Sequence, residues 1–365
     1  MSKRNWILSG LLSFVLMVPL FAGAQFTDSK LISKRYSVSP GTKIEITNKY
    51  GRVKINTWKK DSVVFEIKVK VEDKKLSKLE KTMGEIDFDF SSGQHYLIAR
   101  ARVGENRSTL EKEVINLKET LLQSDGKIDI DFSVWLPDGN QLKVENKFGD
   151  IFMDDYSGEL EIILSNGNLK AHDFTGKTTL TFNFADATIN QLKNTRINSN
   201  YSELYIKNAE KLNLTSKSSE FDLDMVKELT TDSRRDKFRI QEVTSLNAKG
   251  SFTNYRIDEM IETGNIKTEY GDIYLEKVSQ NFKSVYIESK STDCELAFHR
   301  SSAFGFEILQ TKSQVSFAPE IKRDKETVLD EKEKKIETNG TFGSGSKVVK
   351  LQMNVASGQI RIDSY

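Results

Sequence analysis

Apolar and polar residues alternate along most of the chain, in short blocks separated by small or turn-forming residues. The blocks NKYGRVKINTW (48–58), NKFGDIFMDDY (146–156) and TEYGDIYLEKV (268–278) share one layout: an aromatic residue, a glycine, and then apolar residues at every second position. Alternation with a period of two is typical of a strand that has one buried face. The pattern therefore predicts short strands, each preceded by a corner.

This layout recurs at a nearly constant spacing. Counting forward from Gly271, Thr292 and Ser313 follow at intervals of 21 residues and Gly358 after a longer one, while Gly51 is an isolated first copy. Counting backward from Gly271, the interval is shorter and almost constant, and the anchor residues are Thr253, Asp236, Ser219, Ser202, Ala185, Gly167 and Gly149. Such anchors suit a corner, because glycine accepts positive φ and small or Asx residues tolerate a close approach.

The columns around the anchors indicate the fold class. Residues two, four and seven positions after an anchor are apolar in almost every copy, and a second short apolar strand precedes the anchor. Two strands in about 17 residues are too few for a propeller blade, and the helix of a leucine-rich repeat is lacking. The sequence predicts an all-β, single-stranded parallel β-solenoid (β-helix), whose stacked coils bury a continuous core.

The regions outside the array are less regular. Residues 25–141 are expected to form a β-rich capping region with one or two short helices, at 73–86 (with Asp73 as the N-cap) and at 108–124. Residues 142–319 form the predicted repeat array. Residues 320–346, which are charged and then rich in Gly and Ser, are expected to be an exposed or mobile insertion, and residues 347–365 the final coil.

Residues 1–24 have the features of a signal peptide. Lys3 and Arg4 precede an apolar run, and Ala22-Gly23-Ala24 resembles a cleavage site. An uncleaved anchor helix is the alternative, although the run is short and Pro19 interrupts it. We expect an exported protein that is periplasmic, on the cell surface or secreted, with no transmembrane segment after cleavage.

Charge and cysteine content restrict the partners. Lys and Arg number 54 against 53 Asp and Glu, and this balance argues against a nucleic-acid partner. Cys294 is the single cysteine, so the chain forms no internal disulfide. Because Cys294 falls in an inward column, we expect a buried and unreactive thiol.

No catalytic constellation is evident, so no catalytic residue, cofactor or metal is expected. Glu203 and Glu220 occupy one column in adjacent coils, and their separation is close to that of the carboxylates of a retaining glycosidase. Calcium binding by the same column is a further alternative, although the glycine-rich nonapeptide of calcium-binding β-rolls is absent. A solvated ladder of outward side chains is the favoured interpretation, because carboxylates without a cleft cannot tune their pKa values. His95, His172 and His299 occupy unrelated repeat positions, which argues against a histidine metal site.

Two sets of residues are candidates for a ligand surface. The first combines the basic cluster Arg234, Arg235, Lys237 and Arg239 with Tyr205 and Tyr274, where an anionic glycan or partner could dock; a solvated face is the alternative. The second is the aromatic residue that precedes several anchors, for which corner packing is favoured over a sugar-stacking platform. These aromatic residues are Tyr50, Phe148, Phe184, Tyr201, Phe252 and Tyr270.

The export signal, the block NKYGRVKINTW, the segment VWLPDGNQLKVENKFGDI and the degenerate coils together resemble the putative adhesin family of exported β-strand repeat proteins (DUF4097 or "toast-rack" type, Bacteroidetes-like). The resemblance covers roughly residues 35–362 and implies an adhesin-like role without a catalytic residue. We therefore expect a non-enzymatic protein that presents a repeat face to a protein or glycan partner at the cell envelope. A polysaccharide-acting β-helix enzyme and a purely structural or sensory envelope component are the alternatives.

Overall fold

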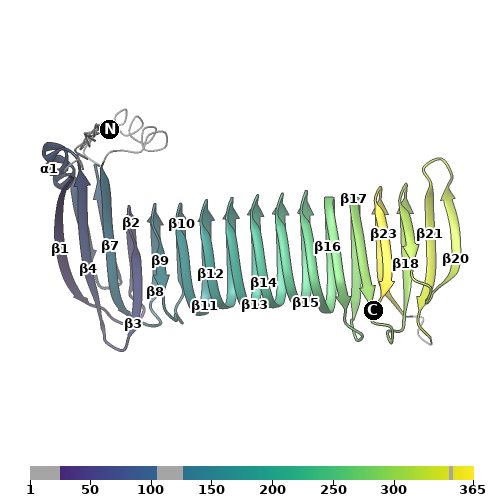
Figure 1. Cartoon of the computed structure of the whole chain (residues 1–365). Helices are drawn as coiled ribbons and strands as arrows, with labels where there is room; N and C mark the ends of the chain where they lie inside the picture. Colours follow the sequence, from purple (N-terminus) through teal and green to yellow (C-terminus); the bar gives the residue numbers. More distant parts are fainter. Residues whose placement is uncertain (1–24, 105–125, 345–347) are drawn as a thin grey trace, which may run out of the picture.

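The computed structural model describes residues 25–104, 126–344 and 348–365. The predicted signal peptide (1–24) and the predicted helix at 108–124 lie outside these residues. Figure 1 shows an elongated row of narrow coils stacked side by side, with antiparallel strands closing each end. The described residues contain 23 strands and one helix, which confirms the all-β prediction. This helix is too short and too polar to cross a membrane.

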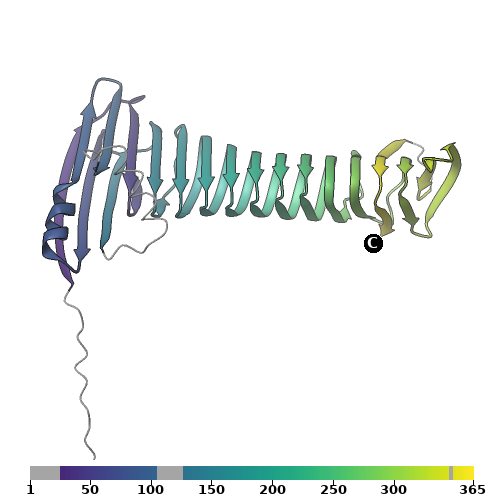
Figure 2. The same ribbon diagram turned by 90° about the horizontal axis from the view of Figure 1, so that it is seen from above.

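In the middle of the row, strands pair in parallel with the strand that follows them in the chain. Opposed residues are one repeat apart, as for Leu204 opposite Phe221 and Leu169 opposite Ala187, and Ile273 lies opposite Cys294 where one coil is longer. Figure 2 shows these coils from a second direction. Their strands are β10 (Leu160–Ser165), β11 (Asn168–Asn183), β12 (Asp186–Asn200), β13 (Glu203–Lys217), β14 (Glu220–Arg234), β15 (Lys237–Ser251), β16 (Asn254–Val278) and β17 (Ser284–Phe298).

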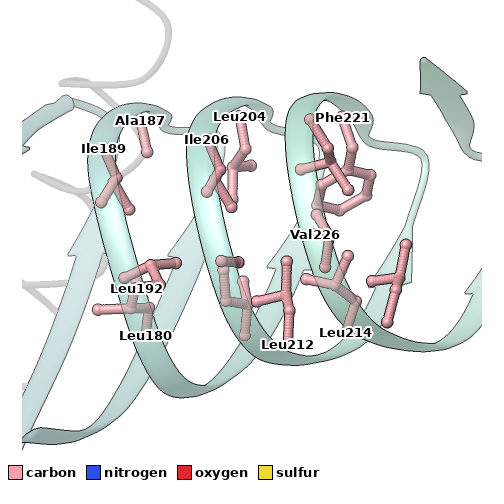
Figure 3. Close-up of a cluster of buried hydrophobic side chains, with 14 of the residues drawn as sticks. Leu180, Ala187, Ile189, Leu192, Leu204, Ile206, Leu212, Leu214, Phe221 and Val226 are labelled. Atoms are coloured by element: carbon pink, nitrogen blue, oxygen red, sulfur yellow. The ribbon is translucent and has the colours of Figure 1, made fainter. Parts of the chain in front are cut away.

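The predicted inward columns form the core. Leu192, Ala209 and Val226 stack in one column and are at most 5% exposed. Ile189 and Ile206 stack in another, and Figure 3 shows side chains of both columns inside consecutive coils. Each fully buried Leu or Ile contributes roughly 1.5–3 kcal/mol relative to an exposed one. One coil alone could not bury its inner face, so the coils are stable only as a stack.

Most anchor glycines are needed for close packing between coils and do not have a positive φ. A Cβ atom would lie 2.1 Å from the Gly149 carbonyl oxygen at Gly167, and 2.0 Å from the Thr253 oxygen at Gly271. Neither glycine has a left-handed φ. At these two anchors the expectation of a positive φ is therefore wrong, the expectation of a close approach is confirmed, and the left-handed residue stands one position earlier. Gly51 is the one anchor glycine with a positive φ, of 151°.

The N-terminal end departs from chain order. The first coil, β2 (Lys43–Lys49) and β3 (Val53–Trp58), pairs in parallel with strands that come much later in the chain. These strands are β8 (Gln141–Lys147) and β9 (Ile151–Met153). On the outer side the same coil pairs with β6 (Tyr96–Val103) and β7 (Lys127–Pro137).

Antiparallel strands close this end. β4 (Ser62–Asp73) lies between β7 and β1 (Phe26–Ser37), and β5 (Ile86–Ser92) pairs with β6. The helix α1 (Leu76–Gly84) begins after Lys75, and the Asp73 carboxylate accepts a hydrogen bond from the Lys75 N–H at 2.8 Å. The predicted N-cap at Asp73 is wrong, because Asp73 ends β4 and makes a turn before the helix begins.

The C-terminal end also reverses chain order. The last strands, β22 (Val349–Ala356) and β23 (Gln359–Ser364), lie between β17 and the coil formed by β18 (Phe304–Thr311) and β19 (Gln314–Phe317). The order of the anchors suggested that Thr292 lies next to Ser313. In the structure Thr292 lies next to Gly358 instead. Much of segment 320–346 forms a hairpin of β20 (Ile321–Asp330) and β21 (Lys335–Phe342), in which β21 pairs with β18 and β20 is mostly exposed.

Candidate ligand-binding surface

One corner of every coil is in the left-handed conformation. Each corner residue immediately precedes an anchor, and its φ lies between 50° and 67°. At most of these corners its N–H donates to a carbonyl of the neighbouring coil, as from Tyr201 to Lys217 O at 3.0 Å. We call these positions the corner column: Tyr50, Phe148, Asn166, Phe184, Tyr201, Ser218, Arg235, Phe252, Tyr270, Ser291, Lys312 and Ser357.

Half of the corner column is aromatic, although this conformation favours Gly and Asn and is unusual for bulky side chains. We call the six aromatic residues the aromatic ridge: Tyr50, Phe148, Phe184, Tyr201, Phe252 and Tyr270. They form three stacked pairs between neighbouring coils. The ring centroids are 5.7 Å apart for Tyr50–Phe148, 5.0 Å for Phe184–Tyr201 and 4.9 Å for Phe252–Tyr270, with interplanar angles of at most 13°.

The ridge is open to solvent in spite of this stacking. Phe184 is 61% exposed, and the other ridge aromatics of the array are between 41% and 51% exposed. Within residues 142–319, the only other exposed large apolar side chains are Tyr205, Met225 and Tyr274. The exposed aromatic surface of the array is therefore concentrated on the corner column and the strand that follows it.

A row of cations borders the ridge. Five of these cations immediately precede a corner residue, and we call them the basic row: Lys49, Lys147, Lys217, Arg234 and Lys290. The Lys147 Nζ lies 5.1 Å from the centroid of the Phe148 ring, and the Lys217 Nζ lies 5.9 Å from that of Tyr201. Arg235, in the corner column itself, approaches the Phe252 ring at 6.0 Å. Cations in such positions are attracted to the negative ring faces.

Carboxylates border the opposite side of the ridge and connect the coils. The Asp150 Oδ1 accepts from the Asn168 N–H at 2.9 Å, and the Asp293 Oδ1 accepts from the Gln359 N–H at 2.8 Å. Glu203 and Glu220 are neighbours in register, and Lys237 Nζ lies 2.5 Å from the Glu220 carboxylate. These contacts favour a ladder that supports the coils over a pair of carboxylates poised for catalysis.

The structure divides the predicted basic cluster between two places. Arg234 and Arg235 lie at the corner, beside the ridge. Lys237 and Arg239 lie on the following strand, where they form ion pairs with Glu220, and Arg239 also pairs with Asp222. The Asp222 carboxylate raises the pKa of Arg239 above its ordinary value through a hydrogen bond and charge attraction.

Tyr205 and Tyr274 share an outward column with Arg239, but several coils separate them. The Tyr205 hydroxyl donates to the Asp224 carboxylate at 2.6 Å, and this hydrogen bond raises the pKa of Tyr205. Tyr274 lines a shallow hollow over β17, β19 and β23 together with Glu295, Ser316 and Arg361. The nearby Asp272 carboxylate raises the pKa of Tyr274.

A buried polar network lies under the corner. Asp236 is 1% exposed, and its carboxylate accepts from the Ser216 hydroxyl at 2.6 Å, the Ser219 N–H at 2.8 Å and the Arg234 N–H at 3.2 Å. Burial raises the pKa of Asp236 in spite of these bonds. The anchor pattern identified Asp236 only as a turn residue, because two of its three partners, Ser216 and Ser219, come from the preceding coil.

The described residues contain no cluster of three or more His, Cys, Asp or Glu side chains that could hold a metal ion. His172 lies 3.7 Å from the Asp155 carboxylate on an exposed surface, and the His299 Nδ1 accepts from the Ser301 N–H. These two histidines therefore lie in separate surroundings.

Comparison with known proteins finds similar solved structures at low sequence identity. No protein-family model matches the chain, and no curated protein matches its sequence. A putative adhesin from Parabacteroides distasonis is 14% identical, with 74% of this chain and 94% of that chain covered and a TM-score of 0.34. A putative adhesin from Parabacteroides merdae is 13% identical, with 74% and 92% covered and a TM-score of 0.27. A putative cell adhesion protein from Clostridium sporogenes is 11% identical, with 92% and 100% covered and a TM-score of 0.20.

Proposed function

We propose that the protein is an exported, non-enzymatic, adhesin-like binding protein that presents the corner of its β-solenoid to a partner at the cell envelope. The observation that carries this proposal is the aromatic ridge, because exposed aromatic side chains in a row are costly to leave in water and are typical of interaction sites. The signal-peptide pattern at residues 1–24 supports export.

The surface supports binding rather than catalysis. Glu220 is held in ion pairs with Lys237 and Arg239, and the carboxylates beside the ridge accept backbone hydrogen bonds from neighbouring coils. A general acid or base needs a site that tunes its pKa, and an open strand face exposed to water supplies little of that tuning.

Purified protein, sedimented with bacterial envelope fractions over a range of protein concentrations, tests the proposal. We expect saturable binding and no release of reducing sugar ends from envelope polysaccharides during prolonged incubation. Steady release of reducing ends would instead favour the polysaccharide-acting enzyme. Failure to bind any envelope fraction would contradict the adhesin-like role.

A further inference from the structure

The arrangement of the ridge indicates the chemistry of the partner. The rings of each stacked pair are nearly parallel but offset, because their centroids are farther apart than the ~3.5–4.0 Å of direct carbon contact, so part of each ring face stays open beside the gaps between pairs. Small or polar corner residues fill these gaps: Asn166 between Phe148 and Phe184, and Ser218 and Arg235 between Tyr201 and Phe252. The Phe148 and Phe184 rings, on either side of Asn166, are two coil spacings apart, or ~10 Å. A flat ligand unit can therefore enter between stacked pairs.

Spacing along the ridge favours a polymer. Each coil advances the array by ~4.8 Å, which is close to the advance of one sugar residue in an extended polysaccharide. The C–H groups on the face of a sugar ring are electropositive and pack against the negative face of an aromatic ring. A polysaccharide lying along the array would thus meet an aromatic pair at every third or fourth coil.

The cations beside the ridge favour an acidic polymer. Lys147, Lys217, Arg234, Arg235 and Lys290 have no carboxylate oxygen within 4.0 Å in the part of the chain that the structure describes. Three cations on the neighbouring strands differ, since Lys237, Arg239 and Arg256 all form ion pairs. The charge at the corner is therefore available to an anionic ligand, whereas the charge of these three strand cations is already neutralised.

We propose that the aromatic ridge, the basic row and Arg235 form the binding site for a carboxylate-bearing polysaccharide that lies along the array. Its sugar rings stack on the aromatic side chains, its carboxylates contact the basic row, and its hydroxyls donate to the carboxylates on the opposite side. This inference rests on the proposed binding function and specifies its ligand class and its site.

The test measures retardation of the protein in native gels that contain polygalacturonate, beside gels with the same polymer after chemical reduction of its carboxylates. The ridge variant is Phe184→Asn with Tyr201→Asn. Asparagine suits the left-handed corner, as Asn166 shows at a φ of 55°. The basic variant is Lys217→Gln with Arg235→Gln. The matched controls are Met225→Asn, and Lys211→Gln with Lys227→Gln, which alter exposed side chains away from the ridge. Circular dichroism checks that each variant is folded.

We expect polygalacturonate to retard the wild type and the reduced polymer to retard it far less. Loss of two stacking contacts should weaken binding by roughly tenfold or more in the ridge variant. The basic variant, which removes two of the six cations beside the ridge, should bind more weakly and show a weaker salt dependence, and the controls should stay within about twofold.

Equal binding of the acidic and the reduced polymer would overturn the charge assignment, and wild-type affinity in the folded ridge variant would overturn the site. Absence of any retardation by polygalacturonate would overturn the ligand class. In each of these cases saturable binding of the same protein to envelope fractions would leave the proposed function standing, so the two failures are distinguishable.

Discussion

In the middle of the array each coil pairs with the coil that follows it in the chain, whereas at both ends the neighbour comes from a distant segment. Leu204 lies opposite Phe221, its counterpart in the next repeat, but Ile44 lies opposite Leu142 and Cys294 opposite Ile360. The inward residues alternate in the same way in both regions. What differs is the edge: an open strand edge at the end of a solenoid must be covered, and the ends cover it with strands from elsewhere in the chain.

The largest expected effect is the loss of stability on substituting an inward residue of a middle coil, compared with an outward neighbour. Ile257 is fully buried, and Ile257→Asp places an unpaired charge in the core. We expect the free energy of unfolding in guanidinium chloride to fall by about 4 kcal/mol or more. The adjacent Arg256→Asp, which removes an exposed ion pair with Glu276, should cost less than about 1 kcal/mol. Similar losses for both variants would refute the inward register of this coil.

A second prediction compares an anchor glycine of the middle with one of the end. Gly271→Ala would bring Cβ to 2.0 Å from the Thr253 oxygen, and Gly358→Ala would bring it to 2.1 Å from the Thr292 oxygen. Because backbone must move in both cases, we expect each variant to lose about 2–3 kcal/mol in the same denaturation experiment. If Gly358→Ala were neutral, the final coil would not pack against Thr292.

A third prediction concerns Asp236, in the middle of the array. Burial raises its folded-state pKa above the ordinary value of 3.8, so the folded protein retains this proton at pH values where the unfolded chain has lost it. The contribution of Asp236 to stability is therefore fully present below the ordinary pKa and decreases as the pH rises through the raised pKa. In Asp236→Asn, the slope of unfolding free energy against pH should be shallower in the acidic range above that ordinary value. An unchanged slope would show that Asp236 keeps an ordinary pKa.

The smallest expected effect is at Cys294, where the middle of the array meets the end. Cys294 is 2% exposed, and burial raises the pKa of its thiol to about 12. We expect slow labelling by a thiol reagent in native protein, rapid labelling in denaturant, and a change in unfolding free energy below about 1 kcal/mol for Cys294→Val. Rapid labelling of native protein would mean that this coil is out of register.

The alternation of apolar and polar residues predicted which side chains point into the coils. It did not predict which strands pair with each other at the two ends of the array. The inward positions of Leu204, Phe221 and Cys294 follow from alternation alone, and all three are buried. The insertion of β22 between β17 and β18 could not be predicted, because several strands with the same alternation compete for the same edge. Their pairing is decided by hydrogen bonds between segments far apart in the chain.

The candidate surface was also only partly predicted, because contacts between coils are not visible in the local pattern. The aromatic residues before the anchors are visible in the sequence, but their left-handed φ and their stacking depend on contacts between coils. The basic cluster is also visible, yet Arg239 is neutralised by Asp222 of the preceding coil. A signal was present for this pairing, since opposite charges at the repeat spacing indicate a ladder across neighbouring strands.

Disulfide cross-linking tests the central claim. This claim is that alternation determines which residues face inward, whereas strands at the ends of the array pair out of chain order. Glu295 and Ser316 would be neighbours if chain order held, but Arg361 lies opposite both of them. In a Cys294→Val background, Glu295→Cys with Arg361→Cys should form an internal disulfide in native protein, because adjacent coils are within bonding range. Glu295→Cys with Ser316→Cys should not, since two coil spacings, ~10 Å, exceed that range. A disulfide in the second variant but not in the first would contradict the account.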